Sequence, residues 1–402
     1  MNKKLQYIIT RKENKIIRML LQDQKPLEIH CDANESELVG SIYVARVRDI
    51  VKYLNAAFVE YQPGKVAFYS LLDHASPVYV KKCNPNNPNL AQGDEILVQI
   101  SKDAVKTKDP VATTCLSFTG RYLVLTVGRT FLGISGKITD QEWKQNVKKD
   151  LSDLCSKEYG FIVRTNAYET ELSEIKKEAK QLKEQWEELK QKAPFRSCYS
   201  LLQEPVRPFL LDLLNVYGQS AGYEMEKVVT DDPEIYNQLQ AFVRLQMPQM
   251  EPLLQLYEDN MVSLSNIYRI DKILEDATRK NVWLKSGGYL VVEPTEALTV
   301  IDVNTGKMNT KQKNRTAIRK LNLEAAKEIA HTLRLRNISG MIVVDFVNME
   351  EEEDNELLLL EMRKYVSMDP VKTTVLDMTP LGLVELTRKK VNRSLLEQLA
   401  KK

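Results

Sequence analysis

The stretch from Ala297 to Asn304 reads ALTVIDVN, and the stretch from Gly340 to Phe346 reads GMIVVDF. Runs this rich in valine and isoleucine are typical of buried β-strands. Each run carries an aspartate near its end, Asp302 in the first and Asp345 in the second. The two stretches therefore predict two strands that present carboxylates where a sheet opens to solvent.

A helix is predicted between these strands, over roughly residues 310–336, because apolar residues recur there at three- and four-residue steps. Those positions are Ile318, Leu321, Ala325, Ile329 and Leu333. The order strand, helix, strand predicts a crossover unit with parallel strands, which brings both aspartates to one edge of the sheet. Three cations near the helix start are open to two interpretations, ordinary solvation or a grip on phosphates: Arg315, Arg319 and Lys320.

Two carboxylates at one sheet edge are also open to two interpretations. Together, Asp302 and Asp345 can hold a hard cation such as Mg²⁺, which takes oxygen ligands and keeps several waters. Such an ion polarises a phosphodiester and lowers the pKa of an attacking water. Taken singly, an aspartate at a strand end more often caps a loop or starts a turn. The residues alone leave both interpretations open.

The composition is ordinary for a folded protein and excludes several classes. The 402 residues allow two to four domains, and 43% hydrophobic with 28% charged residues argues against wholesale disorder. There is no run of about 18 apolar residues and no apolar signal-peptide core near Met1. The five cysteines have no paired spacing, which predicts a reducing compartment and no zinc site. We therefore expect a cytoplasmic enzyme, and the net charge of +2 leaves nucleic-acid binding to local patches.

Residues 40–125 contain several short β-like runs separated by turn residues, which predicts a small β-barrel. Barrels of this kind can bind single-stranded nucleic acid by stacking bases on aromatic side chains. Phe58 and Phe68 lie in two of these runs. Because a strand buries every second residue, both side chains are open to two interpretations, core of the barrel or stacking surface.

A phosphate-binding candidate lies in the stretch Tyr159–Thr165, which reads YGFIVRT. A guanidinium fork pairs with phosphate through two charged hydrogen bonds, and a hydroxyl adds a third. Arg164 and Thr165 supply these groups, although an arginine after a strand is more often an ordinary surface residue. A charged helix is predicted next, over roughly residues 169–192, and its single apolar stripe predicts packing against the neighbouring sheet.

In sequence order, five segments resemble the ribonuclease E/G family: Thr295–Asn304, Asn322–Ala326, Arg334–Arg336, Gly340–Phe346 and Leu381–Lys390. The resemblance runs along nearly the whole chain. It implies that Asp302 and Asp345 bind a catalytic magnesium ion and that Asn304 orients Asp302. Manganese also suits these oxygen ligands. The implied activity is endonucleolytic hydrolysis of single-stranded RNA that leaves a 5′-phosphate and a 3′-hydroxyl, in ribosomal RNA processing, messenger RNA decay or both.

The resemblance also implies where the RNA is bound. The barrel is similar to an S1-type domain, in which the residues that contact the strand would be Phe58, Phe68, Lys102 and Lys108. Arg164 and Thr165 match a 5′-sensor that holds the terminal monophosphate of the substrate and so stimulates cleavage. Lys372 stands where relatives often carry arginine, and lysine keeps the charge without the bidentate fork. We therefore expect only a weak phosphate contact from Lys372.

The expected fold is α+β and multidomain, with an S1/OB-type β-barrel inserted in a ribonuclease-H-like domain and followed by an α/β metal-dependent nuclease domain. The ribonuclease-H-like structural domain would comprise residues 1–35 and 215–280, and the barrel residues 36–125. A 5′-sensor region with the long helix would span residues 126–214, and the nuclease domain residues 281–402. The ribonuclease-H-like assignment rests on the resemblance alone.

The chain departs from the larger family members beyond the catalytic domain. Those members carry paired cysteines through which two chains share a zinc ion, whereas no cysteine follows Cys198 here. We therefore expect no zinc, and a homodimer would rest on packing between catalytic domains. Two other functions stay open, a catalytically inactive S1-type RNA-binding scaffold and a phosphodiesterase acting on DNA or small nucleotides. Comparing RNA with DNA of the same sequence tests the last, because 2′-hydroxyl contacts distinguish the two.

Overall fold

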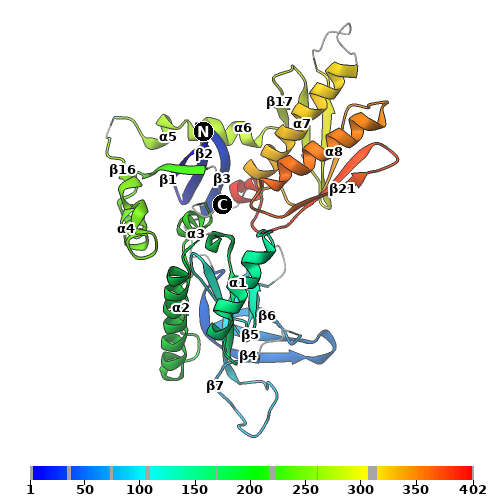
Figure 1. Ribbon diagram of the computed structural model, residues 1–402. Helices are drawn as coiled ribbons and strands as arrows, with labels where there is room; N and C mark the ends of the chain where they lie inside the picture. Colours follow the sequence, from blue (N-terminus) through cyan, green and yellow to red (C-terminus); the bar gives the residue numbers. More distant parts are fainter. Residues whose placement is uncertain are drawn as a thin grey trace. The chain divides into compact units, whose positions relative to one another are not determined.

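The computed structural model describes residues 3–33, 38–72, 76–104, 109–168, 170–216, 223–259, 261–306 and 315–400. The chain forms two compact units, one made of residues 1–34 with 222–402 and the other of residues 35–221. Helices and four sheets occur among the described residues (Figure 1), which confirms the predicted α+β multidomain class. The first unit is discontinuous in sequence, because the second is inserted after residue 34.

The first unit contains a five-stranded sheet that combines distant parts of the sequence, in the order β16-β15-β1-β2-β3. Its strands are β1 (Lys3–Lys12), β2 (Lys15–Gln22), β3 (Lys25–Ala33), β15 (Tyr223–Thr230) and β16 (Leu254–Leu256). The same unit carries helices α4 (Pro233–Gln246), α5 (Leu264–Ile267), α6 (Ile270–Thr278) and α9 (Leu395–Ala400). Leu395 of α9 shares one hydrophobic core with Ile8 and Ile29, so α9 packs on the N-terminal strands.

A six-stranded sheet in the same unit has the order β17-β18-β19-β20-β22-β21. Its strands are β17 (Asn281–Trp283), β18 (Tyr289–Pro294), β19 (Leu298–Asn304), β20 (Gly340–Asp345), β21 (Thr373–Met378) and β22 (Leu383–Arg388). Strands β19 and β20 are parallel, as the strand–helix–strand pattern predicts, and the other neighbours are antiparallel. Helix α7 (Arg315–Leu335) lies between β19 and β20 in sequence, and helix α8 (Glu352–Ser367) follows β20.

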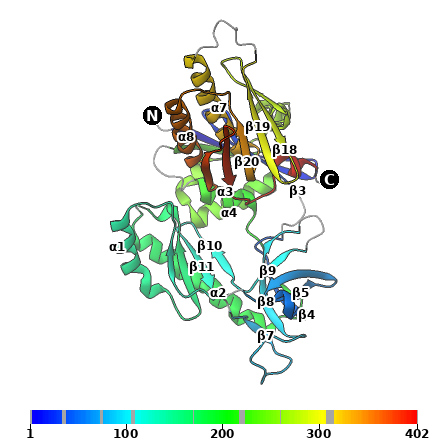
Figure 2. The ribbon, with the colours of Figure 1, turned by 90° about the vertical axis from the view of Figure 1, so that its right-hand side faces the viewer.

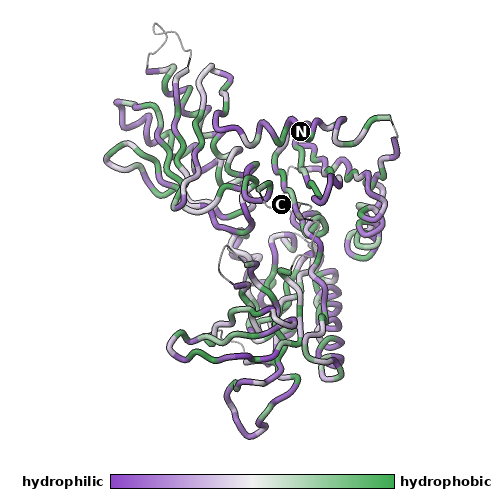
Figure 3. The backbone as a smooth tube through the Cα atoms, turned by 180° about the vertical axis from the view of Figure 1, so that it is seen from behind, coloured by the Kyte–Doolittle hydropathy of each residue, from purple (hydrophilic) through white to green (hydrophobic). Residues whose placement is uncertain are grey.

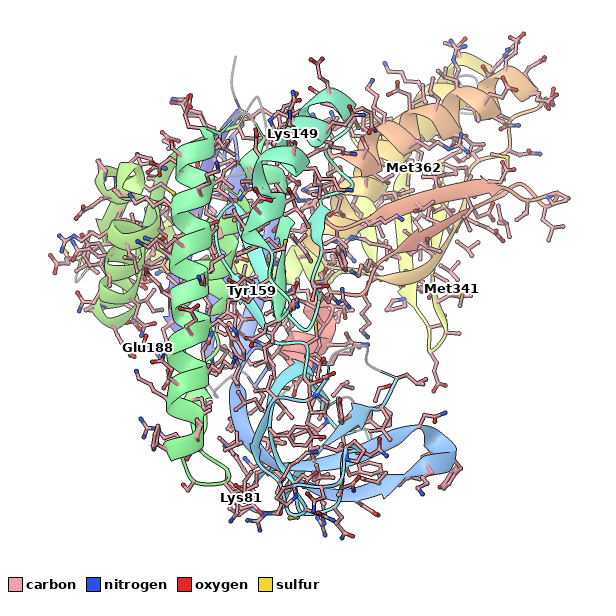
Figure 4. All side chains as sticks on the ribbon, turned by 60° about the horizontal axis from the view of Figure 1, so that its bottom comes forward. Lys81, Lys149, Tyr159, Glu188, Met341 and Met362 are labelled. Carbon is pink, nitrogen blue, oxygen red and sulfur yellow. The ribbon has the colours of Figure 1, made fainter. Side chains whose placement is uncertain are left out.

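Helices α7 and α8 cover one face of this sheet (Figures 1 and 2). Alternate strand residues such as Ile301 and Val344 belong to the core that these helices form with the sheet. Met362 of α8 lies fully inside this core, whereas Met341 of β20 is 54% exposed (Figure 4). Since successive strand residues point to opposite faces, Met341 lies on a second, open face of the sheet.

The second unit contains a β-barrel, which confirms that part of the prediction for residues 40–125, although the barrel strands end at Thr113 and residues 117–119 and 123–127 form strands of another sheet. Five strands close on themselves in the order β4-β5-β6-β9-β8, because β8 also pairs with β4. The strands of this sheet are β4 (Ile42–Val51), β5 (Ala56–Gln62), β6 (Lys65–Ser70), β7 (Tyr79–Lys81), β8 (Glu95–Lys102), β9 (Val111–Thr113) and β14 (Leu201–Gln203). Inward-facing residues such as Val59, Ala67 and Val98 fill the barrel.

A four-stranded sheet of the second unit has the order β10-β11-β13-β12. Its strands are β10 (Ser117–Thr119), β11 (Leu123–Val127), β12 (Leu132–Ile134) and β13 (Tyr159–Val163), and the helices of this region are α1 (Gln141–Leu151), α2 (Leu172–Lys192) and α3 (Pro208–Val216). Helix α2 alternates between hydrophilic and hydrophobic residues along its turns (Figure 3), and its buried Trp186 packs against Phe118 of β10. The predicted packing of this helix on the neighbouring sheet is thus confirmed. Within the described residues, we find no helix long and apolar enough to cross a membrane.

Candidate active site

Asp302 and Asp345 lie side by side at the ends of β19 and β20. They are paired directly in the parallel register, on neighbouring strands about 4.8 Å apart. Ile301 and Val344, which precede them, are buried against α7 and α8, so both carboxylates point to the open face of the sheet. Asp302 is half-buried and Asp345 is exposed. The crossover unit therefore brings the two predicted carboxylates together.

Asn304 lies two residues beyond Asp302 on the same face of β19. Its side-chain Nδ2 donates a hydrogen bond to Oδ2 of Asp302, with 2.7 Å between the two atoms. This bond fixes the orientation of the Asp302 carboxylate, and such support from a neighbouring side chain improves the geometry of a metal ligand. The structure therefore places the third predicted residue where it can orient the first.

The residues at this edge fit a hard divalent cation. Two carboxylates and no thiolate or imidazole favour an ion that prefers oxygen. Among the described residues there is no group of three or more His, Cys, Asp or Glu side chains that could hold a metal. An ion at Asp302 and Asp345 would thus have only two protein carboxylates. That arrangement suits Mg²⁺, which usually keeps several waters beside one or two carboxylates.

A pocket of about 520 Å³ adjoins Asp345. It is lined by residues 345–349, by residues 378–382 and by Asn355. The polar side chains of Asn348, Asn355 and Thr379 lie in this lining. Its volume falls in the range of small-ligand sites, so it can accept a portion of a nucleotide next to the carboxylates.

The two arginines at the start of α7 contact Asp354 at the start of α8. Nε of Arg315 donates to Oδ2 of Asp354 at 2.8 Å, and Nη1 of Arg319 donates to Oδ1 at 3.3 Å. The hydrogen bonds from Arg315 and Arg319 hold the pKa of Asp354 below its usual range. The sequence left two interpretations for Arg315 and Arg319, ordinary solvation or binding of phosphate. The structure gives both guanidinium groups a third role, because they bind Asp354 and so connect α7 to α8. Lys320 is exposed.

Phe58 and Phe68 lie on the outside of the barrel. They are opposite each other on β5 and β6, with ring centroids 6.1 Å apart in an edge-to-face arrangement. Both are half-buried, while their strand neighbours Val59 and Ala67 fill the barrel core. Phe68 also pairs with Val111, and Val111 pairs with Lys102, so the exposed Lys102 lies in the same cross-strand row. The structure therefore excludes the core interpretation of these phenylalanines.

Arg164 follows β13 and binds oxygen atoms of its own chain. Its Nη1 donates to the carbonyl oxygen of Gly120 and its Nη2 to Oδ1 of Asn215, each at 2.5 Å. Burial lowers the pKa of Arg164, and the charge of Glu178 acts in the opposite direction. The hydroxyl of Thr165 lies 3.1 Å from that of Ser135. These contacts hold the guanidinium and the Thr165 hydroxyl in fixed positions beside the end of the strand.

The remaining two predicted residues are less informative. Lys372 is exposed immediately before β21, and its carbonyl oxygen accepts a hydrogen bond from the N–H of Lys389 at 3.0 Å. Lys108 lies outside the described residues. Its predicted contact with RNA stays a prediction.

Comparison with known proteins decides the family. A model of the Ribonuclease E/G family matches residues 117–391. The chain is 31% identical over 381 residues to Ribonuclease G of Haemophilus influenzae, covering 92% of this chain and 76% of that protein. It is 31% identical over 379 residues to Ribonuclease G of Escherichia coli strain K12, with the same coverage. It is 30% identical over 367 residues to Ribonuclease E of a Synechocystis strain, covering 90% of this chain and 54% of that protein. The chain belongs to the ribonuclease E/G family.

Two buried residues of this ribonuclease E/G chain hold predicted residues in place, one beside Asp345 and one beside Arg164, although the sequence motifs alone do not reveal these roles. Asn322 of α7 is fully buried, donates to the carbonyl oxygen of Val347 at 2.7 Å and accepts the N–H of Val347 at 3.2 Å. It therefore fixes the chain two residues beyond Asp345. The sequence does hint at this role, because Asn322 lies among the apolar residues of the predicted helix. A polar side chain that is buried there must find hydrogen-bond partners.

Glu178 plays the corresponding part beside Arg164. Its carboxylate is buried and accepts the backbone N–H groups of Arg121, Tyr122 and Leu123, at 2.5, 2.7 and 2.8 Å. Burial raises the pKa of Glu178, while the three N–H groups and Arg164 oppose that shift. The sequence of this helix predicts packing against the sheet, with a short coiled-coil contact as an alternative, and does not single out Glu178, because glutamates are common along the whole helix.

Proposed function

We propose that the protein is a single-strand-specific RNA endonuclease that uses Mg²⁺-assisted hydrolysis. Membership of the ribonuclease E/G family makes the chain an endoribonuclease. One observation carries the finer proposal, namely the direct pairing of Asp302 with Asp345 on parallel strands, with Asn304 bound to Asp302. A scaffold that only binds RNA has no chemical need for this arrangement.

In this mechanism, Asp302 and Asp345 would hold one Mg²⁺, with Mn²⁺ as an alternative ion of similar preference. When bound, the ion supplies Lewis acidity to the scissile phosphodiester and lowers the pKa of the attacking water. Asn304 keeps the Asp302 carboxylate in the ligating orientation. Attack of water on phosphorus breaks the bond to the 3′-oxygen, so the products carry a 5′-phosphate and a 3′-hydroxyl.

The substrate would be bound by the second unit as well. Phe58 and Phe68 offer half-buried aromatic rings on the outside of the barrel, and stacking of bases on such rings needs no particular sequence. Lys102 lies in the same row of the barrel and would contact the strand, with Lys108 and Lys372 as further cationic contacts. Arg164 and Thr165 would bind the 5′-monophosphate of the substrate and thereby stimulate cleavage.

The domain organisation follows the same proposal. Residues 1–35 and 215–280 would form a ribonuclease-H-like structural domain, residues 36–125 an S1-type barrel, residues 126–214 the 5′-sensor region and residues 281–402 the nuclease domain. The cellular role would be ribosomal RNA processing, messenger RNA decay or both. A homodimer would rest on packing between nuclease domains.

The test uses a short, unstructured RNA with a 5′-monophosphate, incubated with Mg²⁺ and purified protein. We expect internal cuts by the wild type, none in EDTA, and loss of cutting in Asp302→Asn and Asp345→Asn. Glu356→Gln, which alters an exposed carboxylate of α8, serves as the matched control and should cut normally. Cutting that survives both aspartate substitutions would overturn the assignment. Tight RNA binding without cutting would favour the inactive scaffold instead.

A further inference from the structure

Two aromatic side chains on the strands next to β19 have no part in the mechanism above. Trp283 of β17 and Tyr289 of β18 pair across the hairpin, with ring centroids 5.1 Å apart and planes tilted by 48°. Trp283 is 63% exposed and Tyr289 is half-buried. Exposure of an indole to this extent forgoes the stabilisation that burial of its large apolar surface would bring. The two rings are therefore available for contact with another molecule and do not belong to the hydrophobic core.

The strand register puts this aromatic pair in the same row as Asn304. Trp283 is opposite Tyr289, and Tyr289 is opposite Asn304. With strands about 4.8 Å apart, Tyr289 lies one strand and Trp283 two strands away from the residue that orients Asp302. Val282 and Leu290, on the other side of these strands, pack into the core under α7. Both rings thus share the open face of the sheet with the carboxylates.

The hairpin that carries the two rings is fastened to the catalytic strand. Its turn is held by Glu324 of α7, which accepts the N–H groups of Lys285 at 2.7 Å and Ser286 at 3.2 Å. A Cβ atom added at Gly288 would lie 2.8 Å from the carbonyl oxygen of Asn304, so the turn packs directly on the end of β19. These contacts fix the position of the rings relative to Asp302 and Asn304, as a binding surface for a reacting molecule requires.

We propose that Trp283 and Tyr289 form a stacking platform for an unpaired base of the RNA, next to the phosphodiester that is cut. This inference rests on the proposed nuclease function and names the contact that positions its substrate. The ring faces present π-surface and no cation, so they suit a base rather than a phosphate. Every base has a π-face, so the platform would hold the strand at the carboxylates without selecting one sequence. The occupant is a base of the substrate because the surface continues the face that bears Asp302.

The experiment places the fluorescent base 2-aminopurine at successive positions of a single-stranded RNA. Binding is measured with Asp302→Asn protein, so no cutting is needed, and stacking on an aromatic ring is read as quenching. Besides positions that stack on Phe58 and Phe68, we expect a position next to the cut to be quenched, and Trp283→Ala introduced into the same protein should abolish the quenching at that position. Trp283→Phe should retain most of it. Phe195→Ala, which removes a 90% exposed ring of the other unit, is the matched control and should leave it unchanged.

Cleavage by otherwise wild-type protein gives the second readout. Trp283→Ala should lower kcat/KM on the order of 5- to 150-fold, the range of stacking on one base. A substrate that is abasic at the quenched position should lose as much with the wild type and nothing further with Trp283→Ala. Equal quenching in Trp283→Ala at every position would overturn the platform, and cutting by the wild type would then leave the nuclease proposal intact. Quenching that depends on Trp283, without any cutting by the wild type, would overturn the nuclease proposal and leave the stacking platform standing. A change of oligomeric state in Trp283→Ala, with quenching unaltered, would mean that a second protein copy covers the rings.

Discussion

Asn322 shows how a single buried side chain can position a reacting group that it does not touch. It binds both backbone groups of Val347 and so holds the chain beyond Asp345 against α7. Asn322→Ala leaves that N–H and C=O unpaired, which should cost about 1–3 kcal/mol of unfolding free energy. Because Asp345 then loses its fixed position, kcat should fall on the order of 10- to 100-fold while KM for RNA changes little.

The measurement is steady-state cleavage of a single-stranded RNA together with urea unfolding. Thr332→Val is the matched control, because Thr332 is also buried on α7 but lies ten residues further along the helix than Asn322. It should lower stability without a separate loss of kcat. If kcat fell equally in both variants, Asn322 would be structural rather than positioning.

The strand ends could be predicted at the residue scale, because Asp302 and Asp345 each follow a run of valine and isoleucine. The orienting bond from Asn304 is local, since the two residues are neighbours on one face of a strand. The partner of Asn322 lies 25 residues further along the chain. Only the packing of α7 on the sheet decides that pairing, so no local pattern could reveal it.

Helix α2 is the element that holds the Arg164 region together. Glu178 reaches from α2 to three successive N–H groups of residues 121–123, and the carbonyl oxygen of Gly120 accepts from Arg164. A glutamine at position 178 presents an amide N–H₂ to this row of donors, so at least one contact is lost. Glu178→Gln should therefore destabilise the protein by about 1–3 kcal/mol.

The same substitution should also displace Arg164. We expect Glu178→Gln to weaken the preference for 5′-monophosphorylated over 5′-hydroxyl RNA, in the direction of the larger loss in Arg164→Ala. Cleavage rates on the two RNAs give this preference. Lys180→Gln, an exposed change on the same helix, should leave it unaltered. An unchanged preference in Arg164→Ala would remove the sensor assignment altogether.

Elements differ in how far the sequence predicts them. The apolar stripe of α2 and the regular turns of the barrel are local signals, and both predictions are confirmed. The barrel closes through pairing of β4 with β8, which are about fifty residues apart. The pairing of β4 with β8 closes the barrel around a shared core that includes Val59, Ala67 and Val98. No pattern within one strand predicts that closure.

At the scale of the whole chain, the five-stranded sheet is the least predictable feature. Strand β1 pairs with β15, so Lys3 lies beside Tyr223 with the entire second unit inserted between them in sequence. Local periodicity identifies each strand and its buried face, but it does not say which of several distant strands lies beside it. The cost of closing so long a loop is set by the folded second unit, which no pattern within β1 or β15 describes. Only the family resemblance suggested that these two segments combine.

Within the first unit, an ion pair joins this sheet to helix α7. Nε of Arg334 donates to Oε1 of Glu28 on β3 at 2.6 Å, and the Arg334 side chain is only 6% exposed. Burial alone would raise the pKa of Glu28, but the charge of Arg334 and the nearby His30 outweigh it and lower that pKa to about 2. Because the folded pKa is below the unfolded value, this contribution is present above about pH 4.5 and is lost as the pH falls toward 2.

Arg334→Met leaves the largely buried Glu28 carboxylate without its arginine partner, which should cost about 3–5 kcal/mol of unfolding free energy at pH 7. On acidification, Glu28 of the wild type is protonated and the ion pair with Arg334 no longer stabilises the protein. In the variant, Glu28 takes up its proton at a higher pH, which removes the cost of burying its charge. The stability difference between the two proteins should therefore narrow as the pH falls from about 5 to 2. Urea unfolding at several pH values measures this difference. Lys364→Met, which breaks the pair between the exposed Lys364 and the partly exposed Glu361, should show little change in stability at any of these pH values. If the difference in unfolding free energy between the wild type and Arg334→Met stayed constant across that pH range, the stabilising contact of Arg334 would not be its ion pair with Glu28.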